Sequence, residues 1–426
     1  MGCRAVDCRG PLTAIATATA AGAAGAGTET CDVAIIGAGV EGLAAAWALA
    51  RRQAGRIVVL ERGTVGSGFT AKSSGILRCH YGVRSLAAMA WKSLEVLENA
   101  GTVLDADIGH RRAGYLVGVG PDNVAPLAAN VAMQQTLGID AGLIGATEVA
   151  AMLPAAHLDD FAAFAYEPHG GFADGYQTAA AFAGAARRLG VTIRQGAPVV
   201  ALDPVPPGVQ VTLTNGERLQ AGTVVVAAGP WTGPLVAPLG IDLPLRTQRE
   251  QLMVVAPGVD LPAPPVLSDL VSLQYVRLWQ AGTDGRGTRL LVGNSDHHAP
   301  EWSDPDHYSD APEDEPLVAA VGKFGHRFPS LADAGLESSY AGCYDVTPDY
   351  NPVIGPAPVA GVVLCTGFSG HGFKISPAVG ELVADLVVKG ASGDPDVPET
   401  DFRLERFAAG QPLVSPHPYA GAGEMR

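Results

Sequence analysis

The chain has 426 residues, of which 47% are hydrophobic and 17% are charged, and its formal net charge is -15. This is the composition of a globular protein long enough for two or three domains. The excess of acidic residues argues against nucleic-acid binding, and the sequence contains no run of about 18 strongly apolar residues that would predict a membrane span.

The first 29 residues differ in composition from the rest of the chain. A tract of Ala, Gly and Thr from residue 14 to 27 follows Arg4 and Arg9. It resembles a secretory signal, but these residues carry little transfer energy, so we predict a disordered extension or a start codon placed too early. The six cysteines (positions 3, 8, 31, 79, 343 and 365) show no zinc-type spacing. They predict free thiols in a reducing compartment, and hence a cytoplasmic protein.

A βαβ unit follows the extension. Residues 32–36 predict a buried strand, residues 43–53 a helix and residues 56–60 a second strand, with the glycine-rich sequence 37–42 between the first strand and the helix. Glu61 ends the second strand. A glycine fingerprint between strand and helix, with an acid at the end of the next strand, is typical of dinucleotide binding.

Each glycine of this fingerprint has an expected role. Gly37 makes the tight turn, Gly39 lets the backbone approach a pyrophosphate, and Gly42 packs helix against strand. Glu61 would accept a hydrogen bond from a ribose hydroxyl, which favours FAD or NAD over NADP. The alternative is a chance glycine turn in a chain with 54 glycines.

Further βαβ-type elements follow between residues 170 and 231. A glycine-rich segment, 170–175, precedes a predicted helix. The turn Asn215-Gly216 predicts a hairpin. Residues 223–228 predict a buried strand that leads into a loop at Gly229. The predicted elements are a helix at 176–189, strands at 191–193 and 197–200, a hairpin of 209–213 with 217–219, and the strand at 223–228.

Two stretches, 113–166 and 243–342, lack this rhythm. Segments 251–255, 273–278 and 290–292 predict antiparallel strands. The predicted fold is therefore α/β (α+β overall), with a discontinuous Rossmann-like βαβ domain and an inserted lobe of antiparallel or mixed sheet. The expected division is an extension (1–29), the βαβ domain (30–112, 167–242 and 343–395), a substrate-binding lobe (113–166 and 243–342) and a C-terminal tail (396–426).

A second glycine loop lies near the C-terminus, at residues 367–374. An apolar strand, 362–365, leads into it and a predicted helix, 377–389, follows it. This order aims backbone N–H groups and the positive end of a helix at an anion. Two such loops, one at each end of the chain, predict one long ligand across one fold.

These motifs resemble the D-amino-acid-oxidase-like flavoprotein superfamily, and most closely its sarcosine oxidase branch, including the catalytic subunit of multisubunit sarcosine oxidases. The resemblance covers residues from about 31 to 390. Four motifs carry it: the fingerprint through Glu61, Thr70 to Tyr81, Ala227 to Trp231, and Gly342 to Asp349 together with Gly367 to Lys374.

The resemblance implies FAD, with its adenine half on the fingerprint and its flavin between the second and fourth motifs. It implies oxidation of a carbon–nitrogen bond in a small amino acid or an N-methyl or N-alkyl amino acid, by hydride transfer to the flavin, followed by hydrolysis of the imine. The expected partners are a small carboxylate-bearing amine and O2 or another electron acceptor. The sequence does not indicate whether the chain forms oligomers.

Five residues are the candidate catalytic set. Arg78 and Lys374 match positions at which sarcosine oxidases bind the substrate carboxylate, although Arg78 could instead be a surface or ribityl-contacting arginine. Tyr344 matches a tyrosine of the substrate pocket. Tyr275 and Arg277, on a strand of the inserted lobe, are weaker candidates, and Arg277 could serve a second carboxylate.

The cofactor-binding candidates come from all four motifs and from one further strand. His371 is expected to contact the cofactor rather than transfer a proton, and the positive end of the helix near Ser376 is expected to stabilise the reduced flavin. The candidates are Gly37, Gly39, Val40, Glu41, Gly42, Glu61, Arg62, Ser67, Thr70, Lys72, Ser73, Ser74, Gly75, Val199, Ala228, Gly229, Trp231, Gly342, Cys343, Phe368, Ser369, Gly370, His371, Gly372, Phe373 and Lys374.

The chain departs from the sarcosine oxidases in two places. In this chain Gly342 aligns with the cysteine that attaches FAD in covalent-flavin sarcosine oxidases, and Cys343 falls one residue later. We therefore predict that FAD binds non-covalently. The run 293–300 lacks their oxygen-activating lysine, which leaves oxidase and dehydrogenase both open. His297 and His298 are adjacent loop residues that rarely converge on one ion, so no metal is predicted.

Three other functions fit part of the sequence. A D-amino-acid oxidase or dehydrogenase fits the same motifs, because its substrates also present a carboxylate and a C–N bond. An accessory, non-catalytic flavin-binding subunit would lack the residues that bind the substrate carboxylate, whereas this chain has Arg78 and Lys374. An NAD-dependent dehydrogenase explains the fingerprint but not the fourth motif.

Overall fold

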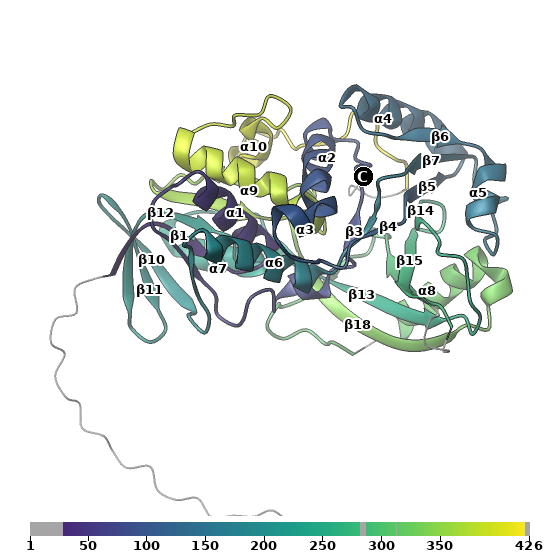
Figure 1. Ribbon diagram of the computed structural model, residues 1–426, viewed down its shortest axis with the longest axis horizontal. Coiled ribbons are helices and arrows are strands. Elements are labelled where there is room, and N and C mark those ends of the chain that lie inside the picture. The colour runs from purple at the N-terminus through teal and green to yellow at the C-terminus, as the bar shows by residue number, and fades with distance from the viewer. Residues whose placement is uncertain (1–28, 282–286, 312, 422–426) are drawn as a thin grey trace, which may run out of the picture.

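A computed structural model of the chain describes residues 29–281, 287–311 and 313–421 (Figure 1). The extension predicted for residues 1–29 lies outside the described residues except for Glu29, which begins the first strand, β1. None of the described helices combines the length and the apolar character that crossing a bilayer requires.

An eight-stranded sheet forms one half of the molecule. Its centre is parallel, in the order β9-β2-β1-β12-β20, and the hairpins β10–β11 and β19–β20 extend it. The β11–β12 pairing confirms the predicted hairpin at Asn215-Gly216. The strands are β1 (Glu29–Ile36), β2 (Ile57–Leu60), β9 (Thr192–Arg194), β10 (Val199–Val205), β11 (Gly208–Leu213), β12 (Arg218–Val226), β19 (Val353–Pro356) and β20 (Val362–Thr366).

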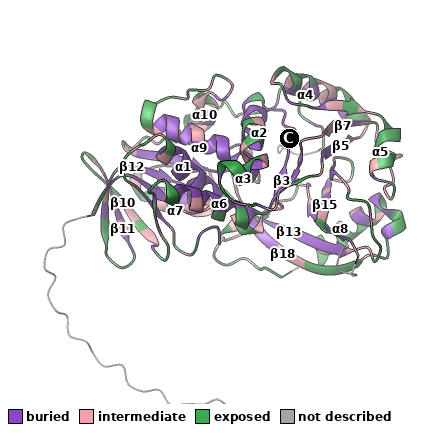
Figure 2. Ribbon diagram, viewed as in Figure 1, coloured by how far each residue is buried: buried purple, intermediate pink, exposed green. Residues whose placement is uncertain are grey.

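Helices α1 and α9 pack against each other beside this sheet, flanked by α2 and α6 (Figure 1). Gly380 of α9 lies so close to the backbone of Ala44 in α1 that a side chain would not fit. Both helices are largely buried (Figure 2), so their contact is part of the main core. The helices of this half are α1 (Val40–Arg51), α2 (Arg84–Glu98), α3 (Ala100–Val103), α6 (Gly175–Arg188), α7 (Thr232–Val236), α9 (Gly372–Lys389) and α10 (Glu405–Ala408).

A nine-stranded mixed sheet forms the other half. Its order is β17-β13-β16-β15-β14-β5-β7-β6, with β18 paired along β13. The strands are β5 (Tyr115–Val119), β6 (Gly142–Ile144), β7 (Ala163–Glu167), β13 (Arg246–Ala256), β14 (Val266–Asp269), β15 (Gln274–Gln280), β16 (Arg289–Asn294), β17 (Glu301–Trp302) and β18 (Gly335–Val346). Its helices are α4 (Val124–Thr136), α5 (Ala146–Met152) and α8 (Asp314–Arg327).

A third sheet is small and antiparallel. Its strands, in order, are β3 (Ile76–Leu77), β8 (Gly171–Phe172) and β4 (Arg111–Arg112). The mixed α/β architecture predicted from the sequence is therefore confirmed. The predicted strands 251–255, 273–278 and 290–292 correspond to β13, β15 and β16, which pair antiparallel.

Some predicted boundaries are wrong. The segments 217–219 and 223–226 form one strand, β12, whose first part pairs with β11 and whose last part pairs with β20. Helix α9 begins at Gly372, five residues before the predicted start at Pro377. A proline inside a helix leaves the carbonyl four residues earlier without its N–H partner. Here the Ser376 hydroxyl donates to that carbonyl, of Phe373, at 3.0 Å, so the helix tolerates Pro377.

Candidate active site

The first glycine loop is shaped by backbone contacts that leave no room for side chains. Gly37 has a φ of +103°, and a Cβ atom there would clash with the carbonyl of Ala227 at the end of β12. The Glu61 carboxylate accepts hydrogen bonds from the backbone N–H groups of Ala38 at 2.8 Å and Gly63 at 2.7 Å. Glu61 therefore ties the end of β2 to the loop.

The start of α1 is held in the same way. A Cβ atom on Gly42 would clash with the carbonyl of Gly37, so glycine is needed for helix and loop to meet. The Val40 N–H donates to the Thr70 hydroxyl at 3.2 Å, which brings the short helix η1 (Phe69–Lys72) against the loop.

One cavity of about 560 Å³ joins the first glycine loop to the second. Most of the residues predicted to bind the cofactor line it. They are Gly37, Gly39, Val40, Glu41, Glu61, Arg62, Ser67, Thr70, Lys72, Ser73, Ser74, Val199, Ala228, Gly229, Trp231, Gly342, Cys343, Phe368, Gly370, Gly372, Phe373 and Lys374, and Tyr344 joins them.

Seven predicted residues are not part of the lining: Gly42, Gly75, Arg78, Tyr275, Arg277, Ser369 and His371. Gly75 has a φ of +66°, and a Cβ atom there would clash with the carbonyl of Ala173. The Ser369 hydroxyl accepts from the backbone N–H of Thr347 at 3.3 Å. His371 Nδ1 lies 3.2 Å from the Tyr81 hydroxyl.

Arg78 is buried behind the cavity, among aromatic rings. Its guanidinium donates to the carbonyl of His80 and lies 4.2 Å from the centre of the Tyr81 ring. Burial lowers the pKa of Arg78, but Tyr81, Tyr115 and Glu167 outweigh it and raise the pKa. Arg78 is therefore a charged residue that, in this conformation, does not line the cavity.

Lys374 lies in the first turn of α9 and lines the cavity. Its Nζ donates to the carbonyl of Gly370 at 3.2 Å, and its charge interacts with Glu41. The first turn of α9 also presents backbone N–H groups that have no partner within the helix. A cation and a positive helix end thus occupy the same corner of the cavity.

Two side chains of β15 hold the second motif in place. Arg277 Nε donates to the carbonyl of Ser74 at 2.6 Å, and the Tyr275 phenol forms a hydrogen bond with the Ser74 side chain. Burial lowers the pKa of Arg277 to about 10. Burial raises the pKa of Tyr275 and of Tyr344, so both phenols are neutral hydrogen-bonding groups.

Two carboxyl groups lie close to the start of α9. Burial raises the pKa of Glu41 well above its ordinary value, with the Asp345 carboxyl contributing in the same direction. Both carboxyl oxygens of Glu41 are buried without a hydrogen-bond partner among the described residues. Asp345 accepts from the backbone N–H of Gly367 at 2.6 Å and from the Thr366 hydroxyl at 3.2 Å, which fixes the second glycine loop.

An acidic loop, residues 304–310, contacts residues that line the cavity. Asp306 accepts from Arg62 and from the Trp231 indole, both at 2.9 Å. The guanidinium carbon of Arg62 lies 3.8 Å from the centre of the Trp231 ring. The Trp231 ring stacks on the Phe69 ring, with 5.4 Å between the ring centres. Asp310 pairs with Lys72. The acidic loop of one half therefore binds three cavity-lining residues of the other.

Cys343 lines the cavity with a thiol that is almost fully buried. Burial raises its pKa to about 12, so the thiol stays protonated near neutral pH. Since the thiolate is the nucleophilic form, Cys343 is poorly suited to attach a cofactor covalently.

The lining residues that were not predicted as site residues include Phe69, Glu250 and Asp345. Asp345 lies inside the fourth motif, directly after the predicted site residues Gly342, Cys343 and Tyr344. Glu250 could have been found from strand alternation, because residues 248, 250 and 252 of a strand share one face. No local pattern indicates Phe69, whose place depends on Trp231.

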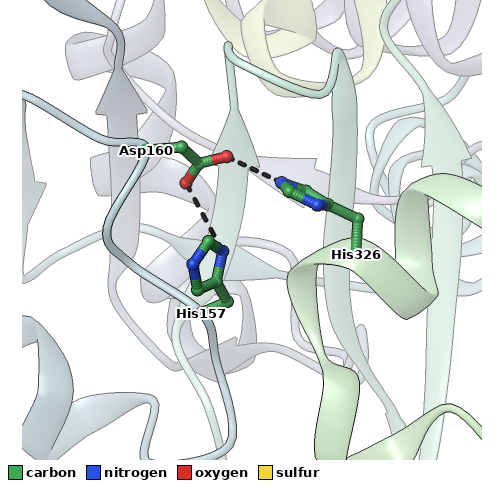
Figure 3. Close-up of side chains that lie close together, drawn as sticks. All are labelled: His157, Asp160 and His326. Atoms are coloured by element: carbon green, nitrogen blue, oxygen red, sulfur yellow. Dashed lines mark hydrogen bonds and ion pairs between the residues drawn. The ribbon is translucent and has the colours of Figure 1, made fainter.

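One group among the described residues has the geometry of a metal site: His157, Asp160 and His326, which lie in the second half and not in the cavity (Figure 3). The Asp160 carboxylate already accepts from His326 at 2.8 Å. Arg327 donates to both of its oxygens, at 2.7 and 3.0 Å. A carboxylate neutralised by a guanidinium is a poor ligand, so we assign no metal to the group.

The chain is similar in sequence to several flavoenzymes. It is 28% identical to peroxisomal sarcosine oxidase of Homo sapiens over 88% of this chain and 96% of the relative. It is 26% identical to sarcosine oxidase subunit beta of an Arthrobacter species, over 91% of this chain and 94% of the relative.

Solved structures share the fold. Glycine oxidase from Geobacillus kaustophilus matches with a TM-score of 0.72 and 25% identity, over 91% of this chain and 99% of that one. L-Proline dehydrogenase from P. horikoshii matches with a TM-score of 0.80 and 24% identity, over 90% of this chain and 100% of that one. The family model described as "FAD dependent oxidoreductase" matches residues 32–386. The chain therefore belongs to this family of FAD-dependent oxidoreductases.

Proposed function

We propose that the protein oxidises the carbon–nitrogen bond of a small amino acid or N-substituted amino acid. One observation carries the proposal: a single cavity joins the dinucleotide fingerprint to a lysine at the positive end of α9. The relatives named sarcosine oxidase and glycine oxidase support the same class of substrate. The motifs fit D-amino acids as well, and the acceptor would be O2 or another oxidant.

The residues around the cavity fit FAD. Gly37 and Gly42 allow the tight turn and the close contact of helix and loop, and Gly39 lines the cavity where the backbone would approach a pyrophosphate. Glu61 sits beside the loop as an acceptor for ribose hydroxyls, and the α9 N-terminus would face the electron-rich edge of the flavin. The protonated, buried thiol of Cys343 supports non-covalent binding.

The chain's own residues would bind and orient the substrate. FAD, when bound, supplies the hydride acceptor. Lys374 would hold the substrate carboxylate, because a buried ammonium group favours a carboxylate partner. The neutral phenol of Tyr344 would line the substrate side of the cavity, and Tyr275 would support it through a hydrogen bond from outside the lining. Arg78 would join Lys374 only after its guanidinium turns from His80 toward the cavity.

Domain boundaries and location are part of the proposal. We assign residues 30–112, 167–242 and 343–395 to cofactor binding and residues 113–166 and 243–342 to substrate binding. The four described cysteines are free and buried, which supports a reducing compartment such as the cytoplasm.

The test is anaerobic bleaching of the bound flavin by sarcosine, other N-methyl amino acids, iminodiacids and D-amino acids. We expect Lys374→Met to retain FAD but to raise the substrate KM by about ten- to a hundredfold, because a hydrogen bond between charged groups is lost. Lys389→Met, at an exposed position of the same helix, is the control. Purified protein without flavin absorbance, or a Lys374→Met variant with an unchanged KM, would contradict the proposal.

A further inference from the structure

A buried carboxylate faces the substrate side of the cavity. Glu250 lies on β13, opposite Gly342 of β18. Two residues along the ladder, and so on the same face of the sheet, Gln248 is paired with Tyr344. Paired residues of an antiparallel ladder point to the same face of the sheet. Glu250 therefore shares its face with Tyr344, and both line the cavity.

Tyr275 approaches the same face from β15. Gly293 of β16 pairs with Tyr275 on one side and with Leu252 of β13 on the other. A Cβ atom on Gly293 would overlap the Tyr275 ring, so the glycine lets this ring lie across β16 toward β13. Burial is the main cause of the raised pKa of Tyr275 and Tyr344, and the charge of Glu250 contributes in the same direction.

The Glu250 carboxylate has polar partners but no fixed cation. Its side chain accepts a hydrogen bond from the Gln248 amide, and the Nδ1 atom of His297 lies 3.3 Å from Oε1. Only 7% of the residue is exposed. Among the described residues, no lysine or arginine forms an ion pair with it. A buried carboxylate whose one ionisable partner among the described residues is a histidine is only partly compensated, so the cavity favours a positively charged occupant at this wall.

Lys374 and Glu250 thus place opposite charges on two different walls of one cavity. Lys374 suits the carboxylate of an amino acid. Glu250 does not suit the reacting nitrogen, because a neighbouring carboxylate would stabilise the protonated amine, whose lone pair is then unavailable for oxidation. A cation elsewhere on the substrate is the better match.

Given the proposed function, we propose that Glu250 selects substrates with a second cationic group, an amine or a guanidine at the end of the side chain. The carboxylate of such a substrate lies at Lys374 and its distal cation at Glu250, beside Tyr344. Substrates with a distal carboxylate are repelled.

Binding tests this inference without turnover. The ligands are N-methylornithine, N-methylnorvaline and N-methylglutamate, which share the reacting centre and differ in the charge of the distal group. Anaerobic calorimetric titration of the FAD-loaded protein, with its flavin reduced by dithionite beforehand so that it cannot oxidise the ligands, gives their dissociation constants. We expect N-methylornithine to bind at least about tenfold more tightly than N-methylnorvaline, and N-methylglutamate to bind most weakly.

Glu250→Gln should remove this order by weakening N-methylornithine about tenfold or more while N-methylnorvaline changes by less than about twofold. Glu250→Asp keeps the charge and should keep the order, which separates a charge effect from misfolding. Glu315→Gln, at an exposed position of α8, controls for net charge.

Equal affinity for the three ligands in the wild-type protein would overturn the inference, and so would a Glu250→Gln variant that weakens all three equally. Flavin reduction by the same compounds reports separately on the proposed function. If N-methylornithine binds selectively but reduces no flavin, the proposed reaction fails and the role of Glu250 in binding stands.

Discussion

The acidic loop gives a quantitative prediction about cofactor retention. Asp306 joins the loop to Arg62 and Trp231, both of which line the cavity. Asp306→Ala removes both contacts at once. If the cofactor binds the closed form of the loop, weaker closure must appear as weaker FAD binding.

The size of the effect follows from the exposure of the groups. The Arg62–Asp306 pair is about half exposed on both sides, so its loss costs about 0.5 kcal/mol. The indole hydrogen bond contributes about 1 kcal/mol. Together they amount to about 1.5 kcal/mol, which corresponds to about tenfold weaker FAD binding at most.

The assay is titration of apoprotein with FAD, followed by quenching of flavin fluorescence. Asp306→Asn keeps an acceptor for the indole and should lose less than Asp306→Ala. Asp333→Asn removes the same charge from an exposed position outside the acidic loop and should bind FAD like the wild type. A dissociation constant for Asp306→Ala within about twofold of the wild type would show that the loop does not help to hold the cofactor.

Three further predictions concern the cavity wall and its supports. Gly37→Ala would clash with the Ala227 carbonyl, so the purified variant should be colourless; a yellow protein would contradict this. Burial raises the pKa of Glu167 from 4.5 to about 7, so the folded protein keeps a proton that the unfolded chain releases. The free energy of unfolding of the wild type should therefore fall as the pH rises from 4.5 to 7. The Glu167→Gln variant should show no such fall when urea unfolding is measured over the same pH range. Arg406→Ala should lower the free energy of unfolding by about 3–5 kcal/mol, because it leaves the buried Asp349 carboxylate without its cation, and a loss below about 1 kcal/mol would refute that role.

Much of the fold could be predicted from the sequence because its signals are local. The first βαβ unit has a continuous apolar strand, a glycine turn and an alanine-rich helix, and β1, α1 and β2 follow that pattern with shifted ends. The start of α9 was missed because a proline normally stands in the first turn of a helix. The compensating bond from Ser376 to Phe373 has no sequence signature.

The site was harder to predict where its geometry depends on distant contacts. Strand alternation could have revealed Glu250. The orientation of Arg78 depends on Tyr81 and on the His80 carbonyl, which a motif comparison does not include. The contact of Asp306 with Arg62 joins segments of the chain far apart in sequence, so it follows only from the way the two halves pack.

The order of the strands bears on how the protein is made. In the first sheet, β12 pairs on one side with β1, from the start of the described chain, and on the other with β20, near its end. Helix α1 packs along α9, which follows β20. A nascent chain on the ribosome therefore cannot close the pocket until α9 has emerged. The glycine fingerprint is translated before α9, so the cavity that would hold the cofactor is complete only when both segments have been made.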